Sequence, residues 1–223
     1  MEKQRVAIID YGSGNLRSAA KAFEHVVKEH GLDAEILITD RPEDLRQASR
    51  IVLPGQGAFG DCMRGLQSVD GMIEALEESV LENGKPFLGI CVGMQLMATR
   101  GLEHGSHAGL NWIEGEVVPI KPKDPSLKIP HMGWNSLEFP TYSTEQNNRH
   151  FVLRSTETSE NFYFVHSFMF ESMYNHHVLA MSEYGDPITA IVGRDNMIGI
   201  QFHPEKSHKA GLELLFRFME WNP

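Results

Sequence analysis

A cysteine lies between two glycines in the stretch Gly89-Ile90-Cys91-Val92-Gly93. Apolar residues typical of a buried strand precede it, and a segment typical of a helix follows it. The spacing matches a nucleophile elbow, in which glycines two residues before and after the nucleophile avoid collisions in a tight turn. The pattern predicts that Cys91 projects from a strand-to-helix turn, where helix N–H groups and the helix dipole favour its thiolate. The alternative is that Cys91 is a small apolar residue at the end of a buried strand.

A histidine and a glutamate follow another apolar segment, in the stretch Gln201-Phe-His-Pro-Glu205. A thiol nucleophile needs a base that takes its proton and later returns it to the leaving group, and imidazole titrates in the right range. A carboxylate two residues further on could orient that imidazole and stabilise its charged form. We therefore interpret Cys91 as nucleophile, His203 as base and Glu205 as orienting acid, with Cys91 and His203 at the carboxyl ends of strands. A His-Pro-Glu sequence is also typical of a surface turn.

A glycine-rich turn, Pro54-Gly55-Gln56-Gly57, follows a third apolar segment. Acyl transfer passes through a tetrahedral oxyanion that needs at least two N–H donors, one usually from the residue after the nucleophile, here Val92. The backbone around Gln56 and Gly57 is a candidate for the other donor, and glycine would let the peptide change orientation at little cost. An ordinary strand-ending turn is the alternative.

The elements that must position these residues alternate between strands and helices in the N-terminal half. Apolar runs predict strands at residues 5–10, 34–39, 50–53 and 86–91. Helical periodicity predicts a helix from Leu16 that stops at Gly31, a short helix starting at Pro42, and a helical region at about 70–82. Such alternation predicts a parallel, doubly wound sheet with right-handed crossovers.

The composition of the chain changes after Gly101, where proline, histidine and aromatic residues become frequent. Short strands without intervening helices are predicted at residues 112–120, 133–139, 161–170, 177–182, 188–192 and 197–202. Ser207 is expected to cap a final helix whose apolar stripe is Leu212, Leu215, Phe216 and Met219. The expected fold class is α/β, a mainly parallel doubly wound sheet flanked by helices, with antiparallel strands added in the C-terminal half. We expect residues 1–223 to form one domain.

The charge balance and the cysteine count narrow the class of protein. The chain carries 30 acidic and 20 basic residues, a formal net charge of −10, which argues against a nucleic-acid partner because phosphate binding needs concentrated Lys and Arg. Two cysteines without a pairing pattern and a charged start unlike a signal peptide indicate a reducing, cytoplasmic location. The longest apolar stretch, at residues 86–98, is too short to span a bilayer, so no membrane role is expected.

Two alternatives involve a bound cofactor or metal. Gly12-Ser13-Gly14 follows a strand as a dinucleotide-binding loop does, but Arg17 stands where the third glycine belongs. A zinc hydrolase is suggested by His203, Glu205 and His208, which lie close together in the sequence. His104 and His107, with i, i+3 spacing, are a second possible pair of ligands. Neither His-Glu-x-x-His nor paired Cys-x-x-Cys occurs, so we expect no metal and no cofactor.

A further alternative is a scaffold or regulatory subunit in which Cys91 has only a packing role. Thiol reactivity separates the two interpretations, because an activated Cys91 would react with an electrophile near neutral pH and a structural one would resist alkylation.

Five stretches together resemble a known family. Gly89-Ile-Cys-Val-Gly-Met-Gln95 with Gln201-Phe-His-Pro-Glu-Lys-Ser207 is similar to the class I, triad-type glutamine amidotransferases. Asp10-Tyr-Gly-Ser-Gly-Asn-Leu-Arg-Ser18, His131-Met-Gly-Trp-Asn135 and Tyr163-Phe-Val-His-Ser-Phe168 further resemble the glutaminase subunits of imidazole glycerol phosphate synthase, in histidine biosynthesis. The closest alternatives, glutaminases of pyridoxal phosphate synthesis or of anthranilate synthase, are disfavoured by the stretch at 131–135.

The resemblance implies an enzyme that hydrolyses L-glutamine to glutamate and ammonia through a Cys-His-Glu triad. It also implies that the ammonia passes to a partner, a (β/α)8-barrel cyclase subunit in a heterodimer, and that the glutaminase stays weak until this partner and its ligand are bound. Coupling of that kind needs an element with two states, for which the turn at residues 54–57 is our candidate.

The resemblance also assigns roles to further residues. It places the oxyanion strand at Pro54, Gly55, Gln56 and Gly57, and the bound glutamine beside Gln95 and the backbone of Ser167 and Phe168. It assigns the partner interface to Asn15, Trp134, Tyr163 and Lys206. The chain departs from the family pattern in Gln56, where valine is expected, and in Phe168, where tyrosine is common.

Overall fold

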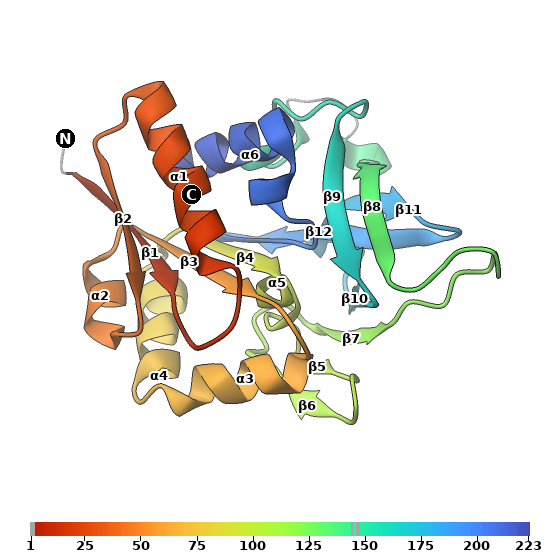
Figure 1. Cartoon of the computed structure of the whole chain (residues 1–223), viewed down its shortest axis with the longest axis horizontal. Helices are drawn as coiled ribbons and strands as arrows, with labels where there is room; N and C mark the ends of the chain where they lie inside the picture. Colours follow the sequence, from red (N-terminus) through yellow and green to blue (C-terminus); the bar gives the residue numbers. More distant parts are fainter. Residues whose placement is uncertain (1–2, 144, 146–147) are drawn as a thin grey trace.

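The computed structural model describes residues 3–143, 145 and 148–223, and a seven-stranded sheet runs through its centre (Figure 1). Its strands are β1 (Gln4–Ile9), β2 (Ala34–Thr39), β3 (Arg50–Gly55), β4 (Phe87–Cys91), β11 (Val178–Glu183), β12 (Pro187–Arg194) and β13 (Met197–Ile200). They lie in the order β11-β12-β13-β4-β3-β1-β2. Neighbours from β13 to β2 are parallel, and β12 and β11 are added antiparallel at one edge. The expected α/β fold class is confirmed.

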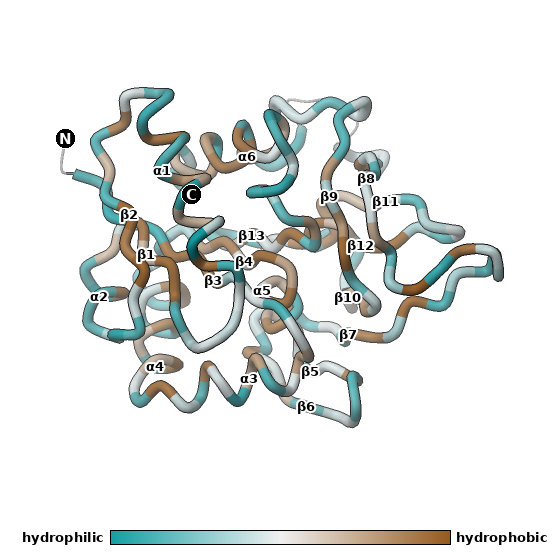
Figure 2. The backbone as a smooth tube through the Cα atoms, viewed as in Figure 1, coloured by the Kyte–Doolittle hydropathy of each residue, from teal (hydrophilic) through white to brown (hydrophobic). Residues whose placement is uncertain are grey.

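Helices cover both faces of this sheet. They are α1 (Leu16–His30), α2 (Pro42–Gln47), α3 (Phe59–Ser68), α4 (Met72–Glu77), the π-helical turn η1 (Glu78–Glu82), α5 (Val92–Gln95) and α6 (His208–Glu220). Figure 1 shows α1 and α6 on one side of the sheet and α2, α3 and α4 on the other. The central strands β1, β3 and β4 are accordingly hydrophobic (Figure 2), and every residue of β3 and β4 is buried.

Helix α3 was missing from the sequence prediction. Its ten residues include Gly60 and Gly65, and glycine lowers helix propensity by about 1 kcal/mol relative to alanine. Both glycines are in close contact with other elements. A Cβ atom on Gly65 would lie 2.7 Å from the Tyr11 carbonyl oxygen, and one on Gly60 would lie 2.9 Å from the His107 ring. Tertiary packing therefore overrides the local preference here.

Two smaller sheets accompany the central one. The first has the order β10-β7-β5-β6, and the second pairs β8 with β9. Their strands are β5 (Arg100–Gly101), β6 (His107–Ala108), β7 (Gly115–Pro119), β8 (His131–Ser136), β9 (Asn161–His166) and β10 (Phe168–Ser172). The 3₁₀ turns are η2 (Thr141–Ser143), η4 (Phe151–Leu153), η5 (Asn175–His177) and η6 (Pro204–Lys206). The strand predicted at 161–170 breaks at Ser167, because β9 pairs with β8 whereas β10 pairs with β7.

The start of α6 differs from the prediction. Ser207 precedes the helix but does not cap it with its side chain. Its hydroxyl donates to the His203 carbonyl oxygen at 2.6 Å and accepts the Tyr163 N–H at 3.0 Å, so it ties the segment that follows β13 to β9. The buried stripe is rotated by one position, since Leu214 and Phe218 are buried beside Leu215 and Met219 and the remaining expected members are only partly buried. None of the helices in the described ranges is long and apolar enough to cross a membrane.

Candidate active site

Cys91 lies at the turn between β4 and α5, as the glycine spacing predicts. Its backbone has φ 55° and ψ −114°, a conformation that costs a non-glycine residue free energy and recurs at functional sites. A side chain on Gly93 would collide with the Leu53 carbonyl oxygen, and a Cβ atom on Gly89 would lie 2.7 Å from the Gly93 carbonyl oxygen. Both glycines are therefore required by the turn. Cys91 is only 5% exposed, so it lies at the bottom of a cavity instead of projecting into solvent.

The helix after Cys91 is shorter than the sequence suggests. Helix α5 has four residues, Val92–Gln95, and a single turn sums few peptide dipoles. The expected dipole contribution to the thiolate is therefore small, and the main charge partner of Cys91 has to be a side chain.

His203 is that side chain. It follows β13, which lies beside β4 in the parallel sheet with Ile200 opposite Ile90. The His203 Nδ1 atom is 2.9 Å from the Glu205 Oε1 atom, and the ring lines the same cavity as Cys91. Since Nδ1 faces Glu205, Nε2 is the nitrogen left for the thiol. The structure thus brings the three predicted residues together, with Cys91 and His203 in one cavity and Glu205 behind His203.

The surroundings of His203 favour its protonated form. Burial lowers the pKa of its ring, but the hydrogen bonds and charges of Cys91 and Glu205 outweigh burial and raise the pKa to about 9. Only 3% of the Glu205 side chain is exposed, and its Oε2 atom has no hydrogen-bond partner among the described residues. An imidazolium beside this carboxylate compensates a negative charge that would otherwise be costly to bury. The ring therefore carries a proton that it can give to a leaving group.

The loop after β3, residues 54–57, lies next to this group. Gly55 pairs with Cys91 in the sheet, and Gln56 and Gly57 are exposed. The Gln56 N–H donates to the Ser13 Oγ atom at 3.2 Å, and the same hydroxyl donates to the Gln56 carbonyl oxygen at 2.6 Å. The Cys62 thiol, 3.3 Å away, donates to that carbonyl as well. The predicted oxyanion donor is thus turned toward Ser13.

A cavity of about 500 Å³ joins these groups. The predicted residues that line it are Cys91, Val92, His203, Gln56, Gly57, Gln95, Ser167 and Phe168, together with Lys206 from the predicted partner interface. Residues that the sequence prediction did not assign to the site also line it, namely Ala58, Glu103, Pro130, Val165 and His166. Its size suits a small ligand.

Gln95 is almost fully buried at the edge of this cavity. Its Nε2 atom donates to the Gln201 Oε1 atom at 2.9 Å and to the Phe168 carbonyl oxygen at 3.3 Å. Gln201 in turn directs its own Nε2 atom toward the Cys91 Sγ atom at 3.7 Å. The sequence prediction missed Gln201, although a polar residue within the apolar stretch that leads to His203 was a signal for it.

Three of the predicted partner residues lie close together. The rings of Trp134 and Tyr163 have centroids 5.8 Å apart, and the Lys206 Nζ atom lies 5.5 Å from the Tyr163 ring centroid. Trp134 is 47% exposed, and the neighbouring Met132 is 64% exposed. Asn15 precedes helix α1, which packs against the turn η6 that carries Lys206. The face around Trp134 and Tyr163 is therefore apolar at its centre, with a cation beside it.

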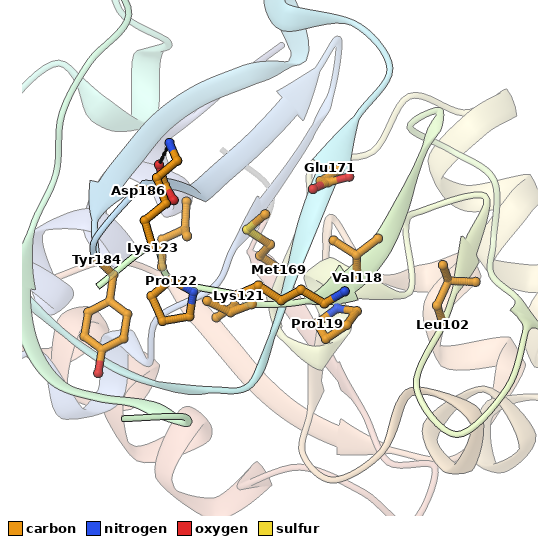
Figure 3. Close-up of a pocket in the computed structure, with 12 residues that line it drawn as sticks. Leu102, Val118, Pro119, Lys121, Pro122, Lys123, Met169, Glu171, Tyr184 and Asp186 are labelled. Carbon is orange, nitrogen blue, oxygen red and sulfur yellow. Dashed lines mark hydrogen bonds and ion pairs between the residues drawn. The ribbon is translucent and has the colours of Figure 1, made fainter. Parts of the chain in front are cut away.

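The zinc alternative finds no ligand set. Within the residues that the structure describes, no group of three or more His, Cys, Asp or Glu side chains could hold a metal ion. A second cavity of about 500 Å³ is lined by aliphatic side chains such as Val118 and Met169 and by Tyr184, with the ion pair of Lys123 and Asp186 at one side (Figure 3). It holds no nucleophile paired with a base, so chemistry is assigned to the cavity at Cys91.

Comparison with known families shows which family the chain belongs to. A family model described as glutamine amidotransferase class-I matches residues 7–221. The chain belongs to the class I glutamine amidotransferases. Two solved structures, each called a glutamine amidotransferase, have the same fold. One, from Thermotoga maritima, has a TM-score of 0.64 and 17% identity and covers 99% of this chain and 98% of its own. The other has a TM-score of 0.65 and 18% identity and covers 95% and 96%.

Curated relatives narrow the family further. The imidazole glycerol phosphate synthase subunit HisH of Rhodospirillum rubrum is 55% identical over 219 residues, which cover 98% of this chain and 100% of that protein. The subunit of the same name from Rhizobium meliloti is 54% identical over 222 residues, covering 98% and 100%. That from Cereibacter sphaeroides is 53% identical over 216 residues, covering 97% and 98%. The chain is thus a HisH-type glutaminase subunit of histidine biosynthesis, and the predicted family and enzyme class are confirmed.

Proposed function

We propose that this HisH-type amidotransferase hydrolyses the side-chain amide of L-glutamine with Cys91 as nucleophile, His203 as acid and base, and Glu205 as orienting acid. The observation that carries this assignment is that Cys91 and His203 line one cavity while the His203 Nδ1 atom contacts the buried Glu205 carboxylate at 2.9 Å. A thiol that is only a packing residue would need neither a charged imidazole nor a carboxylate behind it.

The first half of the reaction forms a thioester. The Cys91 thiolate attacks the amide carbon of glutamine, and the negative charge moves to the amide oxygen. The carbon–nitrogen bond then breaks, and His203 gives its proton to the departing nitrogen, which leaves as ammonia. The protonated state of the His203 ring at neutral pH supports this step. The product on the enzyme is a γ-glutamyl thioester on Cys91.

The second half returns the enzyme to its starting state. The neutral His203 ring takes a proton from a water molecule as the water oxygen attacks the thioester carbon. The carbon–sulfur bond breaks, glutamate leaves, and a Cys91 thiolate and a His203 imidazolium are restored. The hydrogen bond from Nδ1 to Glu205 keeps Nε2 directed at the reacting atoms in both halves.

The oxyanion formed in each half needs two donors. We assign them to the Val92 N–H, directly after Cys91, and to the Gln56 N–H. The Gln56 peptide must then turn from Ser13 toward the cavity. Gly57 has φ 96° and no atom within 4 Å of a Cβ position, so the loop has room to turn. We propose that the two orientations of loop 54–57 are the weak and the active state of the glutaminase.

Glutamine binding is assigned to the far side of the cavity. Gln95 with the backbone of Ser167 and Phe168 would hold the substrate, as the family pattern implies. Glu103 adds a carboxylate to the lining, where it also accepts the Phe59 N–H at 2.8 Å. A carboxylate at that place suits the α-ammonium group of an amino acid.

The ammonia is passed to the partner subunit of imidazole glycerol phosphate synthase, which we propose to be a (β/α)8-barrel cyclase in a heterodimer. The exposed apolar face around Trp134 and Tyr163, with Lys206 beside the cavity, supports docking at the mouth of the site. We further propose that residues 1–223 act as one amidotransferase domain. A cytoplasmic location suits the chemistry, because Cys62 and Cys91 are both free thiols.

Substitution of the nucleophile tests this function. Cys91→Ala is expected to lower glutaminase turnover by at least about 10⁴-fold, because no other group can form the thioester. Binding of the cyclase partner, measured by calorimetry, should stay unchanged. Turnover that persists in a folded Cys91→Ala protein would refute the mechanism. Equal wild-type rates with and without the partner and its nucleotide ligand would refute the proposed coupling.

A further inference from the structure

Two buried histidines lie beside the site and have no part in the mechanism above. His131 is 2% exposed and His166 is 6% exposed. The His131 Nδ1 atom is 2.9 Å from the His166 Nε2 atom, and the His166 Nδ1 atom is 2.8 Å from the Phe168 carbonyl oxygen. The Asn135 Nδ2 atom lies 3.3 Å from the remaining His131 nitrogen, Nε2. We call this line from Asn135 through both rings to the Phe168 carbonyl the histidine relay.

The contacts of the relay define where its protons are. A carbonyl oxygen only accepts, so the His166 Nδ1 atom must carry a proton. In a neutral ring the His166 Nε2 atom then accepts, which makes the His131 Nδ1 atom a donor. The His131 Nε2 atom accepts in turn from the Asn135 amide. Both rings are therefore the Nδ1–H tautomer, and all hydrogen bonds point toward Phe168.

Burial keeps both rings in this neutral state. It lowers the pKa of His131 to about 4. The pKa of His166 is also lowered to about 4, because burial together with the neighbouring rings of His131 and His203 outweighs the hydrogen bond to the Phe168 carbonyl, which raises that pKa. At neutral pH His166 thus has no nitrogen free to act as a second base in the cavity. Both of its ring nitrogens are engaged in hydrogen bonds, one with His131 and one with the Phe168 carbonyl oxygen.

The outer end of the relay is anchored outside the cavity. The His131 ring lies against the rings of Phe164 and Tyr184, with centroids 4.8 and 4.1 Å away. The Tyr184 hydroxyl donates to the Lys128 carbonyl oxygen at 2.6 Å, and Asn135 also donates to the Glu183 carbonyl oxygen at 2.8 Å. Tyr184 lines the second cavity (Figure 3). The relay therefore cannot shift without moving the turn after β11.

The inner end of the relay holds the break between β9 and β10. The Phe168 carbonyl accepts from His166 and from Gln95, and the Ser167 carbonyl accepts the Ile120 N–H at 2.9 Å. Both carbonyls are thus engaged inside the protein. Ser167 and Phe168 line the cavity, so the direction of these carbonyls decides which backbone groups a ligand meets.

We propose that His131 and His166 are positioning residues for the substrate, which hold the Phe168 carbonyl and thereby set the backbone on which glutamine binds. This proposal rests on the proposed function, since it needs glutamine in the cavity at Cys91. It assigns the two histidines to substrate affinity and not to the chemical step.

Paired variants of the full-length protein, assayed in complex with the cyclase partner, test the inner histidine. His166→Phe keeps a ring of similar shape and removes both hydrogen bonds, so KM for glutamine is expected to rise about tenfold while kcat changes less than about threefold. His166→Asn keeps an N–H near the position of Nδ1 and is the matched control. It should restore most of the lost affinity, which a purely structural role of the ring would not predict.

The outer histidine gives a second pair. His131→Phe leaves the His166 Nε2 atom without a donor and should raise KM about threefold, whereas His131→Asn keeps a donor and should lie near the wild type. Nitrogen-15 NMR of wild-type protein with labelled histidines reports the tautomer of each ring without any substitution. Both rings are expected as the neutral Nδ1–H tautomer at pH 7.

Each outcome decides the proposal. An Nε2–H tautomer for His166, an unchanged KM in folded His166→Phe, or a fall in kcat at constant KM would overturn it. If His166→Phe does not fold, the His131 pair and the NMR spectrum decide. Failure of the proposed function itself would show differently, as glutamine turnover that survives Cys91→Ala.

Discussion

The backbone around Cys91 is packed closely against neighbouring strands, whereas the backbone around Gln56 and Gly57 is open to solvent. A side chain on Gly93 would collide with the Leu53 carbonyl, but a Cβ atom on Gly57 would meet no atom within 4 Å. The first region is held by sheet packing and the second by hydrogen bonds to Ser13 and Cys62. Packed cores have few alternative arrangements, while an exposed loop exchanges its hydrogen bonds at small cost.

The two parts of the proposed site therefore differ in how firmly their backbone is held. The proposed nucleophile and its proposed base are held in place before any substrate arrives, because their strands are adjacent in the central sheet. The proposed oxyanion donor is not, because its N–H faces Ser13. In our proposal the amidotransferase thus keeps a nucleophile in position beside an incomplete oxyanion site. Four experiments test that difference, beginning with the largest expected effect.

Alanine at the two glycines tests the difference in packing. Gly93→Ala is expected to destabilise the fold by about 3 kcal/mol or more, because the sheet cannot make room for the new methyl group. Gly57→Ala should cost only about 1–2 kcal/mol, from its left-handed backbone. Chemical unfolding measures both. Equal losses of stability in the two variants would contradict the difference in packing.

Removal of the Glu205 charge tests the fixed half. Glu205→Gln is expected to lower kcat on the order of 10²- to 10⁴-fold, because the imidazolium loses its carboxylate. The wild-type rate should fall as the pH rises through about 9, where His203 loses its proton. Because Glu205 raises the pKa of His203, this fall should begin at lower pH in the variant. A pH profile of kcat checks it, and an unshifted profile would contradict the role of Glu205.

Removal of the Ser13 hydroxyl tests the movable half. Ser13→Ala takes away two of the hydrogen bonds that hold the Gln56 backbone and leaves the one from Cys62, so glutaminase activity without the partner is expected to rise about fivefold. The rate of the complete complex should change little, because in the proposed coupling the partner already favours the active orientation. Ser68→Ala, which removes an exposed hydroxyl bonded to Gly65, is the matched control. A lower rate in Ser13→Ala would show that Ser13 supports catalysis.

The smallest effect is expected from the side chain of Gln56. Its contacts to Ser13 and Cys62 use only backbone atoms, and the residue is exposed. Gln56→Val, which restores the family pattern, should therefore change the rate without the partner by less than about twofold. Steady-state glutaminase assays measure this. A larger change would show that the Gln56 side chain, and not only the loop backbone, controls the rate without the partner.

Local pattern predicted much of the fold and of the candidate site. The alternation of apolar runs with helical stripes predicted the positions of β1 to β4 along the chain, because strand and helix periods are properties of adjacent residues. Helix α3 was missed, since its glycines are explained only by their contacts with Tyr11 and His107. Cys91 could be singled out because its turn requires glycine at fixed offsets in the same segment. Gln201 could not be assigned without its contact to Cys91.

The sequence by itself determined the candidate reacting groups and the order of the elements that carry them. Only the tertiary structure decided how these groups are used: that the Gln56 N–H faces Ser13, that α5 is a single turn, and that His131 and His166 point toward Phe168. The physical reason is distance along the chain. Glycine spacing and periodicity act between near neighbours, whereas a hydrogen bond between residues far apart depends on how the whole core packs.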